Sequence, residues 1–392
     1  MGNVVILDAI RTPFGRFGGK LRELSAVELG ALAAKAVLAR GGIRPEELSE
    51  TIFGTGILDA STAVPARQIN FKVGIPATTP SLTVDRACCS SMTAIGLAAM
   101  KIRFGEAGIV LAGGIESCSQ TPFLMRGTRW GRRLGDFSVE DPMHVRNPIT
   151  GLALTVVTGR KALEHGVPRE EQDEWSFQSH RRYFAAHDAG VYADEILPLT
   201  LEGHGLLAVD EGPRRETSLE KLASLPTVYG SPTVTAGNAP GLNDGASAVI
   251  LMSQEEASRR GLIPLAEVVA YAQLSGDLES SVYMPGHAIL AAAKKAGIGL
   301  RDLKCIEINE AFAAMPLVST KIMAGSDAKE LARLRSMTNV NGGSVAIGHP
   351  PGASGARVAM AALRELRRRG GGYAAAGICG GFGQSDALIL KA

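Results

Sequence analysis

Short apolar runs and stretches of helical periodicity alternate along most of this 392-residue chain. Apolar runs bounded by turn residues predict buried strands, and apolar residues at helical spacing predict packed helices. The expected strands include residues 4–10, 51–57, 107–117, 248–253, 266–274, 305–312 and 373–383. The expected helices cover about residues 25–40, 90–103, 286–296 and 354–369. This alternation predicts an α/β fold with buried strands.

The middle of the chain, from about Ser119 to Pro232, differs in texture. Residues 126–143 are charged and rich in turn formers, and residues 167–190 are expected to form a pair of surface helices. We therefore expect an inserted loop domain over 119–232. The first α/β half then comprises residues 1–118 and 233–262, and the second comprises residues 263–392.

The two halves resemble each other. Each carries a small-residue turn, a helix, a strand and then a glycine pair, over residues 88–117 in the first half and 349–383 in the second. An internal duplication of this kind predicts a pseudo-twofold arrangement in which both turns approach one central cleft. Cys88 and His349 would then meet across about 260 residues of chain.

Composition narrows the class of protein. The chain is 45% apolar and 20% charged, which is typical of a globular protein with two core-forming units. A formal charge of +2 gives no electrostatic reason to expect nucleic acid or a membrane surface as the main partner. The apolar run at the N-terminus is too short for a signal peptide or a membrane span, so a soluble cytoplasmic protein is expected.

Five cysteines are scattered without CxxC spacing, so neither a disulfide framework nor a zinc site is expected, and reduced thiols are the default. Cys88 is the candidate for chemistry because it precedes a predicted helix, whose free N–H groups and dipole lower the pKa of a nearby thiol. The alternative is a small residue buried at a tight turn. Cys89 beside it should point elsewhere.

His349 lies in a rigid loop of glycines and prolines that leads into a helix. Rigid placement suits a general base, and the small residues around it permit close approach by a ligand. The alternative is a hydrogen-bonded structural histidine. The neighbouring glycine runs match neither a P-loop nor a dinucleotide-binding motif.

Taken together, the motifs resemble those of the thiolase family over essentially the whole chain. They include RTPFGRFGGKL, VPARQINFKVGIP, VDRACCSSMTA, GGIESCSQTPF, TVTAGNAPGLNDGASAVILMS, EINEAFA, NVNGGSVAIGHPPGASGAR and CGGFGQSDALIL. The resemblance implies the thiolase fold, in which two similar βαβαβαββ halves pack in an α-β-α-β-α order. It also implies an acyltransferase that condenses acyl-CoA with acetyl-CoA, or cleaves 3-ketoacyl-CoA with CoA.

The resemblance also implies roles for individual residues. Cys88 would carry the acyl group, His349 would be its base, and Cys379 would be a second acid and base at the α-carbon of acetyl-CoA. Asn309 would orient a water in one oxyanion hole together with His349. The backbone N–H groups of Cys88 and Gly381 would form the other oxyanion hole.

Further expectations rest on less specific matches. Arg214 or Arg215, Pro240, Phe312 and Thr150 are expected at the CoA or acyl pocket. The likeness implies CoA thioesters as substrates, no cofactor or metal, and a homodimer or homotetramer, with acetyl-CoA C-acetyltransferase as the leading activity. Cys89, Pro240 and Phe382 depart from the usual residues, which bears on chain length. Basic residues on the loop are interpreted mainly as a solvated run, with CoA phosphates as the alternative: Arg126, Arg129, Arg132 and Arg133.

Three alternatives stay open. A ketosynthase-type condensing enzyme shares the fold and the cysteine nucleophile, but it has no second catalytic cysteine, so Cys379 argues against it. A non-catalytic thiolase-like protein that binds acyl-CoA or lipid would not need the set Cys88, Asn309, His349 and Cys379. A metal site built from cysteine and histidine lacks suitable spacing.

Overall fold

The computed structural model describes residues 2–57, 62–131, 133–143 and 149–392. The strands are β1 Val4–Arg11, β2 Gly15–Arg16, β3 Glu50–Thr55, β4 Ser81–Val84, β5 Ile109–Ser117, β6 Leu199–Leu201, β7 Gly205–Leu207, β8 Asn243–Ser253, β9 Ala266–Ser275, β10 Leu303–Ile308, β11 Tyr373–Cys379 and β12 Gln384–Lys391. The helices are α1 Ala26–Gly41, α2 Pro65–Val73, α3 Ser90–Arg103, α4 Leu154–Glu164, α5 Arg169–Asp188, α6 Leu219–Ala223, α7 Gln254–Arg259, α8 Met284–Ala296, α9 Ala314–Ala324, α10 Ala328–Ser336, α11 Ser344–Ile347 and α12 Pro351–Arg368. Short 3-10 turns are η1 Pro45–Glu47, η2 Cys118–Gln120, η3 Ser280–Val282 and η4 Leu300–Asp302.

The sheet repeats one pattern in both halves. Its order is β4-β3-β5-β8-β1 in the first half and β10-β11-β12-β9 in the second. In the first half β3 is parallel to β5, and β8 is antiparallel to both of its neighbours, β5 and β1. In the second half β10 is parallel to β11, and β12 is antiparallel to both of its neighbours, β11 and β9. The βαβαβαββ pattern has a third strand in each half, and in the first half this strand is β4. Its counterpart in the second half is reduced to one parallel bridge between Ile306 and Thr338. The halves join where β1 pairs with β9 at Val5 and Ile6.

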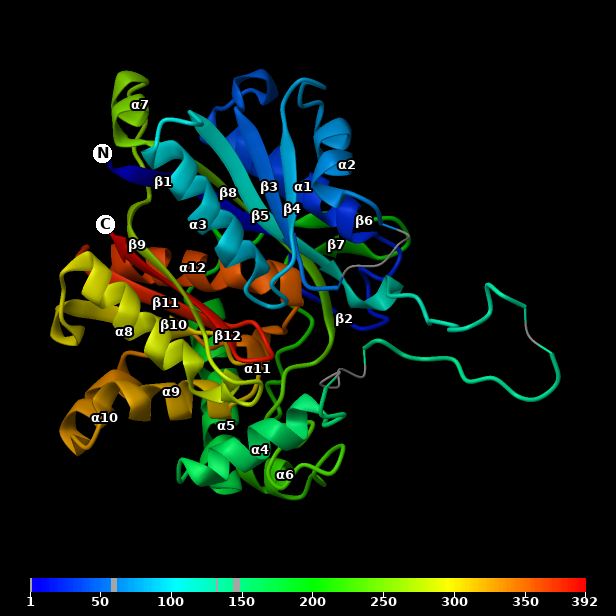
Figure 1. Cartoon of the computed structure of the whole chain (residues 1–392). Helices are drawn as coiled ribbons and strands as arrows, with labels where there is room; N and C mark the ends of the chain where they lie inside the picture. The colour runs from blue at the N-terminus through cyan, green and yellow to red at the C-terminus, as the bar shows by residue number, and fades with distance from the viewer. Residues whose placement is uncertain (1, 58–61, 132, 144–148) are drawn as a thin grey trace.

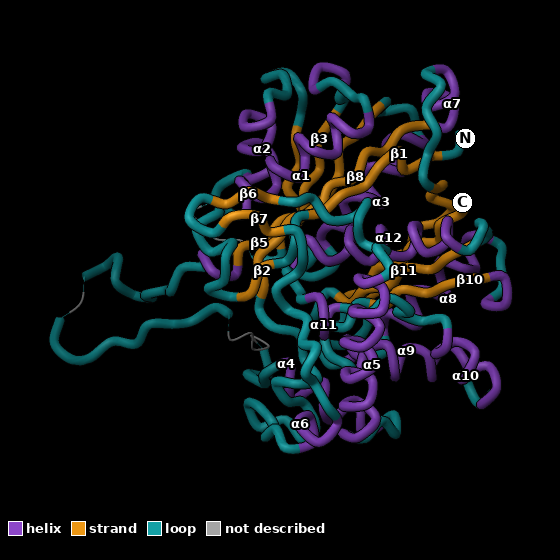
Figure 2. The backbone as a smooth tube through the Cα atoms, turned by 180° about the vertical axis from the view of Figure 1, so that it is seen from behind, coloured by secondary structure: helices purple, strands orange, loops and turns teal. Residues whose placement is uncertain are grey.

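Helices cover both faces of each half, as expected of a layered α-β-α-β-α fold. Figure 1 shows α3 and α12 between the two sets of strands, and Figure 2 shows α1 and α2 over the outside of the first half and α8 over the second. Helix α1 begins at a capping box between Ser25 and Glu28 and ends at Gly42, whose φ is +65°. Helix α12 is buried over most of its length, which explains its run of small residues.

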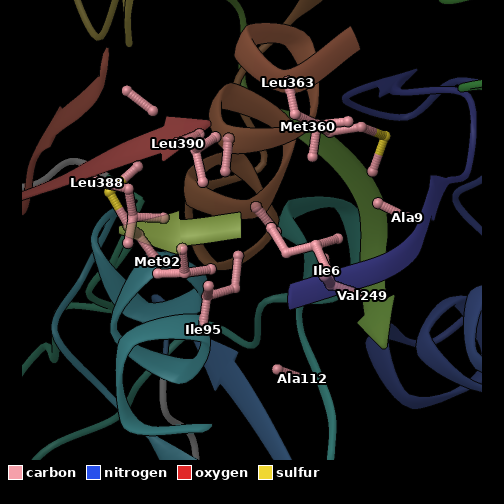
Figure 3. Close-up of a cluster of buried hydrophobic side chains, with 14 of the residues drawn as sticks. Ile6, Ala9, Met92, Ile95, Ala112, Val249, Met360, Leu363, Leu388 and Leu390 are labelled. Carbon is pink, nitrogen blue, oxygen red and sulfur yellow. The ribbon is translucent and has the colours of Figure 1, made fainter. Parts of the chain in front are cut away.

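The central apolar core lies between the two halves of the sheet. Side chains from β1, α3, β8, α12 and β12 point toward one another there (Figure 3), and they include Ile6, Met92, Val249, Met360 and Leu388. Helices α3 and α12 approach closely because Gly355 has no side chain. A Cβ at that position would lie 2.7 Å from the backbone nitrogen of Met92.

The chain between β5 and β8 begins with a long arm that extends away from the body in Figure 1. The expected pair of surface helices over 167–190 is wrong: the structure has a single helix, α5, with one buried face. That face packs because Trp175 and Ser179 donate hydrogen bonds to Glu310, at 2.8 and 2.9 Å. No helix among the described residues has the length and apolar character needed to cross a membrane.

Candidate active site

Cys88 lies in the turn between β4 and α3. Its neighbour Ala87 has φ +50°, an uncommon conformation for a residue with a side chain. The turn is held by Ser90 Oγ, which accepts from the backbone N–H of Arg86 at 2.9 Å. Because α3 starts at Ser90, Cys88 lies directly before the helix N-terminus, as the sequence predicted.

His349 lies in the turn between α11 and α12 and faces Cys88. Its Nε2 is 3.1 Å from Cys88 Sγ, and its Nδ1 is 2.7 Å from Ser354 Oγ. The Ser354 hydroxyl donates to the carbonyl of Pro350 at 2.8 Å, so its oxygen is left to accept from Nδ1–H. This assigns the tautomer in which Nε2 is a free acceptor for the Cys88 proton.

A side chain from the first half fixes the His349 backbone. Asn243 Oδ1 accepts from the His349 N–H at 2.9 Å, and Asn243 Nδ2 donates to the Gly15 carbonyl at 2.7 Å. Gly348 has φ +111°, and a Cβ there would lie 2.6 Å from the Asn243 side chain. Glycine is therefore required beside the histidine.

Cys379 ends β11, which meets the Cys88 turn from the second half. A Cβ at Gly380 would lie 2.7 Å from the Arg86 carbonyl and 2.9 Å from Cys89 Sγ, so the two segments are in close contact. Gly381 follows with φ +63°. Burial raises the pKa of Cys379 to about 11, although N–H groups of Gly381 and of Cys379 itself favour the thiolate.

The electrostatics differ from the sequence expectation for Cys88. Burial raises the pKa of Cys88 well above its usual value, and the nearby Cys379 and Glu116 raise it further. Burial, and then the charge of Arg357, lower the pKa of His349 to about 3. Desolvation thus outweighs the helix N-terminus, and the pair rests as a neutral thiol and a neutral imidazole.

Asn309 follows β10 and is completely buried. Its Oδ1 accepts from Ser344 Oγ at 2.6 Å and from Arg357 Nη2 at 3.3 Å. Its Nδ2 is buried without a hydrogen-bond partner in the part of the chain that the structure describes. An unpartnered buried donor is costly in a folded protein, which points to a ligand or water at this nitrogen.

A cavity of about 770 Å³ opens beside the histidine loop. Its wall includes Gly348, and Leu242 in the same wall forms a backbone bridge with His349. Basic side chains gather around it: Arg16, Arg214, Arg215 and Lys221. The cavity therefore suits an elongated anionic ligand that reaches toward the cysteine and histidine pair.

Only some of the remaining residues predicted at the CoA or acyl pocket line the cavity. Arg214 and Pro240 line the cavity. Phe312 is half-buried and packs in the apolar cluster that contains Cys379, whereas Thr150 is exposed on a loop and does not line the cavity. Arg126, on the arm, pairs with Glu140, and Arg132 lies outside the described residues.

Four polar residues that hold the site were missed by sequence reasoning. Asn243 and Ser354 hold His349, whereas Ser344 and Arg357 hold Asn309. The available signal was a polar residue inside a run of small ones, as in LNDGAS and GASGAR. Among the described residues no group of three or more His, Cys, Asp or Glu could hold a metal ion.

Comparison with known proteins gives matches over almost the whole chain. Residues 4–255 match the family model of the thiolase N-terminal domain, and residues 262–392 match that of the thiolase C-terminal domain. The chain is 40% identical to the mitochondrial 3-ketoacyl-CoA thiolase of Homo sapiens, over 99% of this chain and 98% of that protein. It is 41% identical to an acetyl-CoA acetyltransferase of Chromobacterium violaceum, over 99% of both chains.

A solved structure extends the likeness to three dimensions. The human mitochondrial 3-ketoacyl-CoA thiolase in complex with CoA superposes with a TM-score of 0.93 at 39% identity, covering 100% of this chain and 98% of that one. Both the sequence matches and the shared fold span the full length described above. The chain therefore belongs to the thiolase family and is a thiolase-type acyltransferase.

Proposed function

We propose that this protein catalyses reversible Claisen condensation and thiolysis of CoA thioesters through an acyl group carried on Cys88. The observation that carries this proposal is the 3.1 Å contact between Cys88 Sγ and His349 Nε2. Residues 261 positions apart meet there, with the acceptor nitrogen directed at the thiol. Such a pair of nucleophile and base is the arrangement that covalent catalysis requires.

The first half-reaction acylates Cys88. As Sγ attacks the acyl carbon, its proton moves to His349 Nε2, because both groups rest in their neutral forms. The tetrahedral intermediate then expels CoA as a thiolate, which takes the proton back from His349. Backbone N–H groups of Cys88 and Gly381 would hold the oxyanion, and each such donor can contribute about 2.7–4 kcal/mol.

The second half-reaction forms the carbon–carbon bond. Cys379 acts as its thiolate, which the N–H groups of Gly381 and of Cys379 itself favour, after releasing its own proton to water. The thiolate removes a proton from the α-carbon of acetyl-CoA, and the resulting enolate attacks the acyl carbon on Cys88. Cys88 leaves as thiolate and takes up one proton from water to restore its thiol. Asn309 Nδ2 would orient a water that, together with His349, stabilises the enolate oxygen. In thiolysis the same groups act in reverse, and Cys379 protonates the leaving enolate.

The substrates follow from the cavity and from the relatives. A basic rim at Arg16, Arg214 and Lys221 suits the phosphates of CoA, and one relative is named as a complex with CoA. We assign acetyl-CoA C-acetyltransferase as the leading activity within fatty acid metabolism, with acetyl-CoA, acyl-CoA and CoA as the small-molecule partners. The chemistry described above uses only side chains and CoA thioesters, so no further cofactor is proposed.

Departures at the pocket bear on acyl chain length. Pro240 has no side-chain donor toward the cavity that it lines. Cys89 is buried against the carbonyl of Ile378, and Phe382 takes a φ of +47° next to Gly381. Together these residues reshape the surroundings of the acyl group, so activity on chains longer than acetoacetyl-CoA is part of the proposal.

Self-association is proposed from the arm. Large apolar side chains are exposed along it: Phe123, Met125, Trp130, Leu134, Phe137 and Val139. Clustered exposed apolar residues mark interaction surfaces, and a homodimer or homotetramer would cover them. The cytoplasmic location also stays a prediction, and some relatives are named mitochondrial.

The test compares thiolysis of 3-ketoacyl-CoAs of increasing length by the wild type, Cys88→Ser and Cys379→Ser. Cys88→Ser should form no acyl-enzyme in mass spectrometry. Cys379→Ser should still accept an acetyl group but lose nearly all thiolysis. Full turnover by Cys379→Ser would exclude the two-thiol mechanism, and binding without acylation by the wild type would favour a non-catalytic acyl-CoA-binding protein.

A further inference from the structure

The two ends of the Asn309 amide have different surroundings. Oδ1 is held by Ser344 Oγ and Arg357 Nη2, at 2.6 and 3.3 Å. Nδ2 is buried without a partner in the described part of the chain. A flipped amide would direct its N–H groups at these two donors, so the hydrogen-bond pattern allows one orientation. The orientation that remains keeps both N–H groups of Nδ2 free.

Arg357 controls this arrangement from α12. Its guanidinium is completely buried, and Nη2 donates to Ser344 Oγ at 2.7 Å as well as to Asn309. Ser344 therefore receives a hydrogen bond from Arg357 and passes one to Asn309. Nε and Nη1 of Arg357 have no hydrogen-bond partner among the described residues.

The acid beside Arg357 is a poor partner. Glu307 Oε2 lies 3.8 Å from Arg357 Nη1, beyond hydrogen-bond distance, although both side chains are only 1% exposed. Burial raises the pKa of Glu307 to about 8 despite the Arg357 charge. Desolvating a cation costs several kcal/mol unless it is well paired, so ion pairing does not account for the position of Arg357.

A second buried arginine, Arg11, is held by ion pairs and serves as a comparison for Arg357. Arg11 is also fully buried, but its Nε contacts Glu195 at 2.5 Å and its two terminal nitrogens contact Asp210 at 2.6 and 3.0 Å. Two carboxylates satisfy this guanidinium. The directed hydrogen bonds of Arg357 instead go to Ser344 and Asn309.

We propose that Arg357 and Ser344 are positioning residues that hold the Asn309 amide with Nδ2 toward the water that stabilises the enolate oxygen of acetyl-CoA. Through Asn309 these two residues act on making and breaking the carbon–carbon bond and not on acylation of Cys88, and Arg357→Lys keeps the positive charge that His349 experiences. This inference rests on the proposed function, because it assigns the site at Asn309 to the enolate step and the backbone N–H groups of Cys88 and Gly381 to the acylation step. The positive charge of Arg357 near an oxygen that becomes negative adds to the same effect.

Two assays on each variant separate the steps. Exchange of labelled CoA into acetyl-CoA requires only acylation and deacylation of Cys88. Thiolysis of acetoacetyl-CoA, and exchange of the methyl protons of acetyl-CoA with D₂O, require the enolate. Ser344→Ala and Arg357→Lys should lower kcat for thiolysis and the proton exchange rate by about 10- to 100-fold, the usual effect of losing a residue that orients a reacting group. CoA exchange should stay within about threefold of the wild type, because the Cys88 and His349 pair is intact.

Ser319→Ala is the matched control. Ser319 is equally buried in α9, and its hydroxyl has no hydrogen-bond partner among the described residues, so neither assay should change. Equal losses in CoA exchange and thiolysis for Ser344→Ala, or no loss in either, would overturn the positioning role. Ser344→Ala removes only a hydroxyl, so it gives the answer even where Arg357→Lys does not fold. Absence of CoA exchange in the wild type would instead refute the proposed function itself.

Discussion

Glu116 Oε2 accepts a hydrogen bond from the backbone N–H of Gly352 at 2.9 Å. Glu116 is the last residue but one of β5 in the first half, and Gly352 lies three residues beyond His349 in the second. The same oxygen accepts from the N–H of Gly56 at 2.8 Å. One buried carboxyl therefore ties the histidine loop to the sheet that also supports the Cys88 turn.

The titration of Glu116 makes a prediction about stability. Burial raises its pKa to about 8, whereas an unfolded glutamate titrates near 4.3. The folded state therefore binds the extra proton between these values, and this contribution to stability is present at low pH and lost as pH rises through about 8. Glu116→Gln should flatten the fall in melting temperature between pH 6 and pH 9, since an amide oxygen can still accept both N–H groups. Calorimetry measures the melting temperature as a function of pH, and Glu106→Gln, at an exposed residue, is the control. An equal fall in melting temperature with pH for Glu116→Gln and the wild type would contradict the prediction.

The neutral rest state of Cys88 and His349 makes a prediction about rate. With the pKa of His349 near 3, the imidazole is already a base throughout the range from pH 5 to 7. The acetylation rate of Cys88 at low acetyl-CoA concentration should be flat over that range, measured by rapid quench and mass spectrometry. Above pH 7 it should fall, because ionised Glu116 raises the pKa of Cys88. A step near pH 6.5 would mean that the histidine titrates as it does in water.

The basic rim makes a prediction about binding. Arg214→Ala should raise the KM for CoA by about 10- to 160-fold with little change in kcat, because a charge-assisted hydrogen bond contributes about 1.5–3 kcal/mol equally to ground and transition states. Added salt should shrink the difference, since the contact is exposed. Steady-state kinetics with Arg44→Ala, whose side chain lies outside the cavity wall, is the comparison. An unchanged KM would remove Arg214 from the CoA contacts.

Local elements were predictable from local signals. The helix expected over about residues 25–40 is α1, because Ser25, Glu28 and Gly42 mark its ends. The helix expected at 90–103 is α3, and the strand and helix alternation of the two halves is the one observed. The prediction of two surface helices over 167–190 was wrong because the polar side chains of α5 suggested an exposed segment. Some of these side chains contact buried groups such as Glu310, which lies far away in the sequence.

The sequence named candidate site residues, but it did not predict the environment that the structure gives them. Motifs singled out Cys88, Asn309, His349 and Cys379, but a helix N-terminus suggested a lowered thiol pKa where burial raises it. The burial that raises this pKa comes from residues distant in the sequence, so a local sequence pattern does not predict it. The domain boundaries, the roles of these residues and the oligomeric state stay predictions.

The sequence by itself determined the family and the α/β class, and it singled out the candidate reactive side chains, because these depend on residue types in local patterns. The tertiary structure alone decided that Nε2 of His349 meets Cys88 Sγ at 3.1 Å, that Glu116 links the two halves, and that Arg357 reaches Asn309. These contacts join residues 261, 236 and 48 positions apart. The first two contacts join the two halves and form only when both halves pack on the shared layer of α3 and α12, whereas the third forms only when α12 packs against the end of β10.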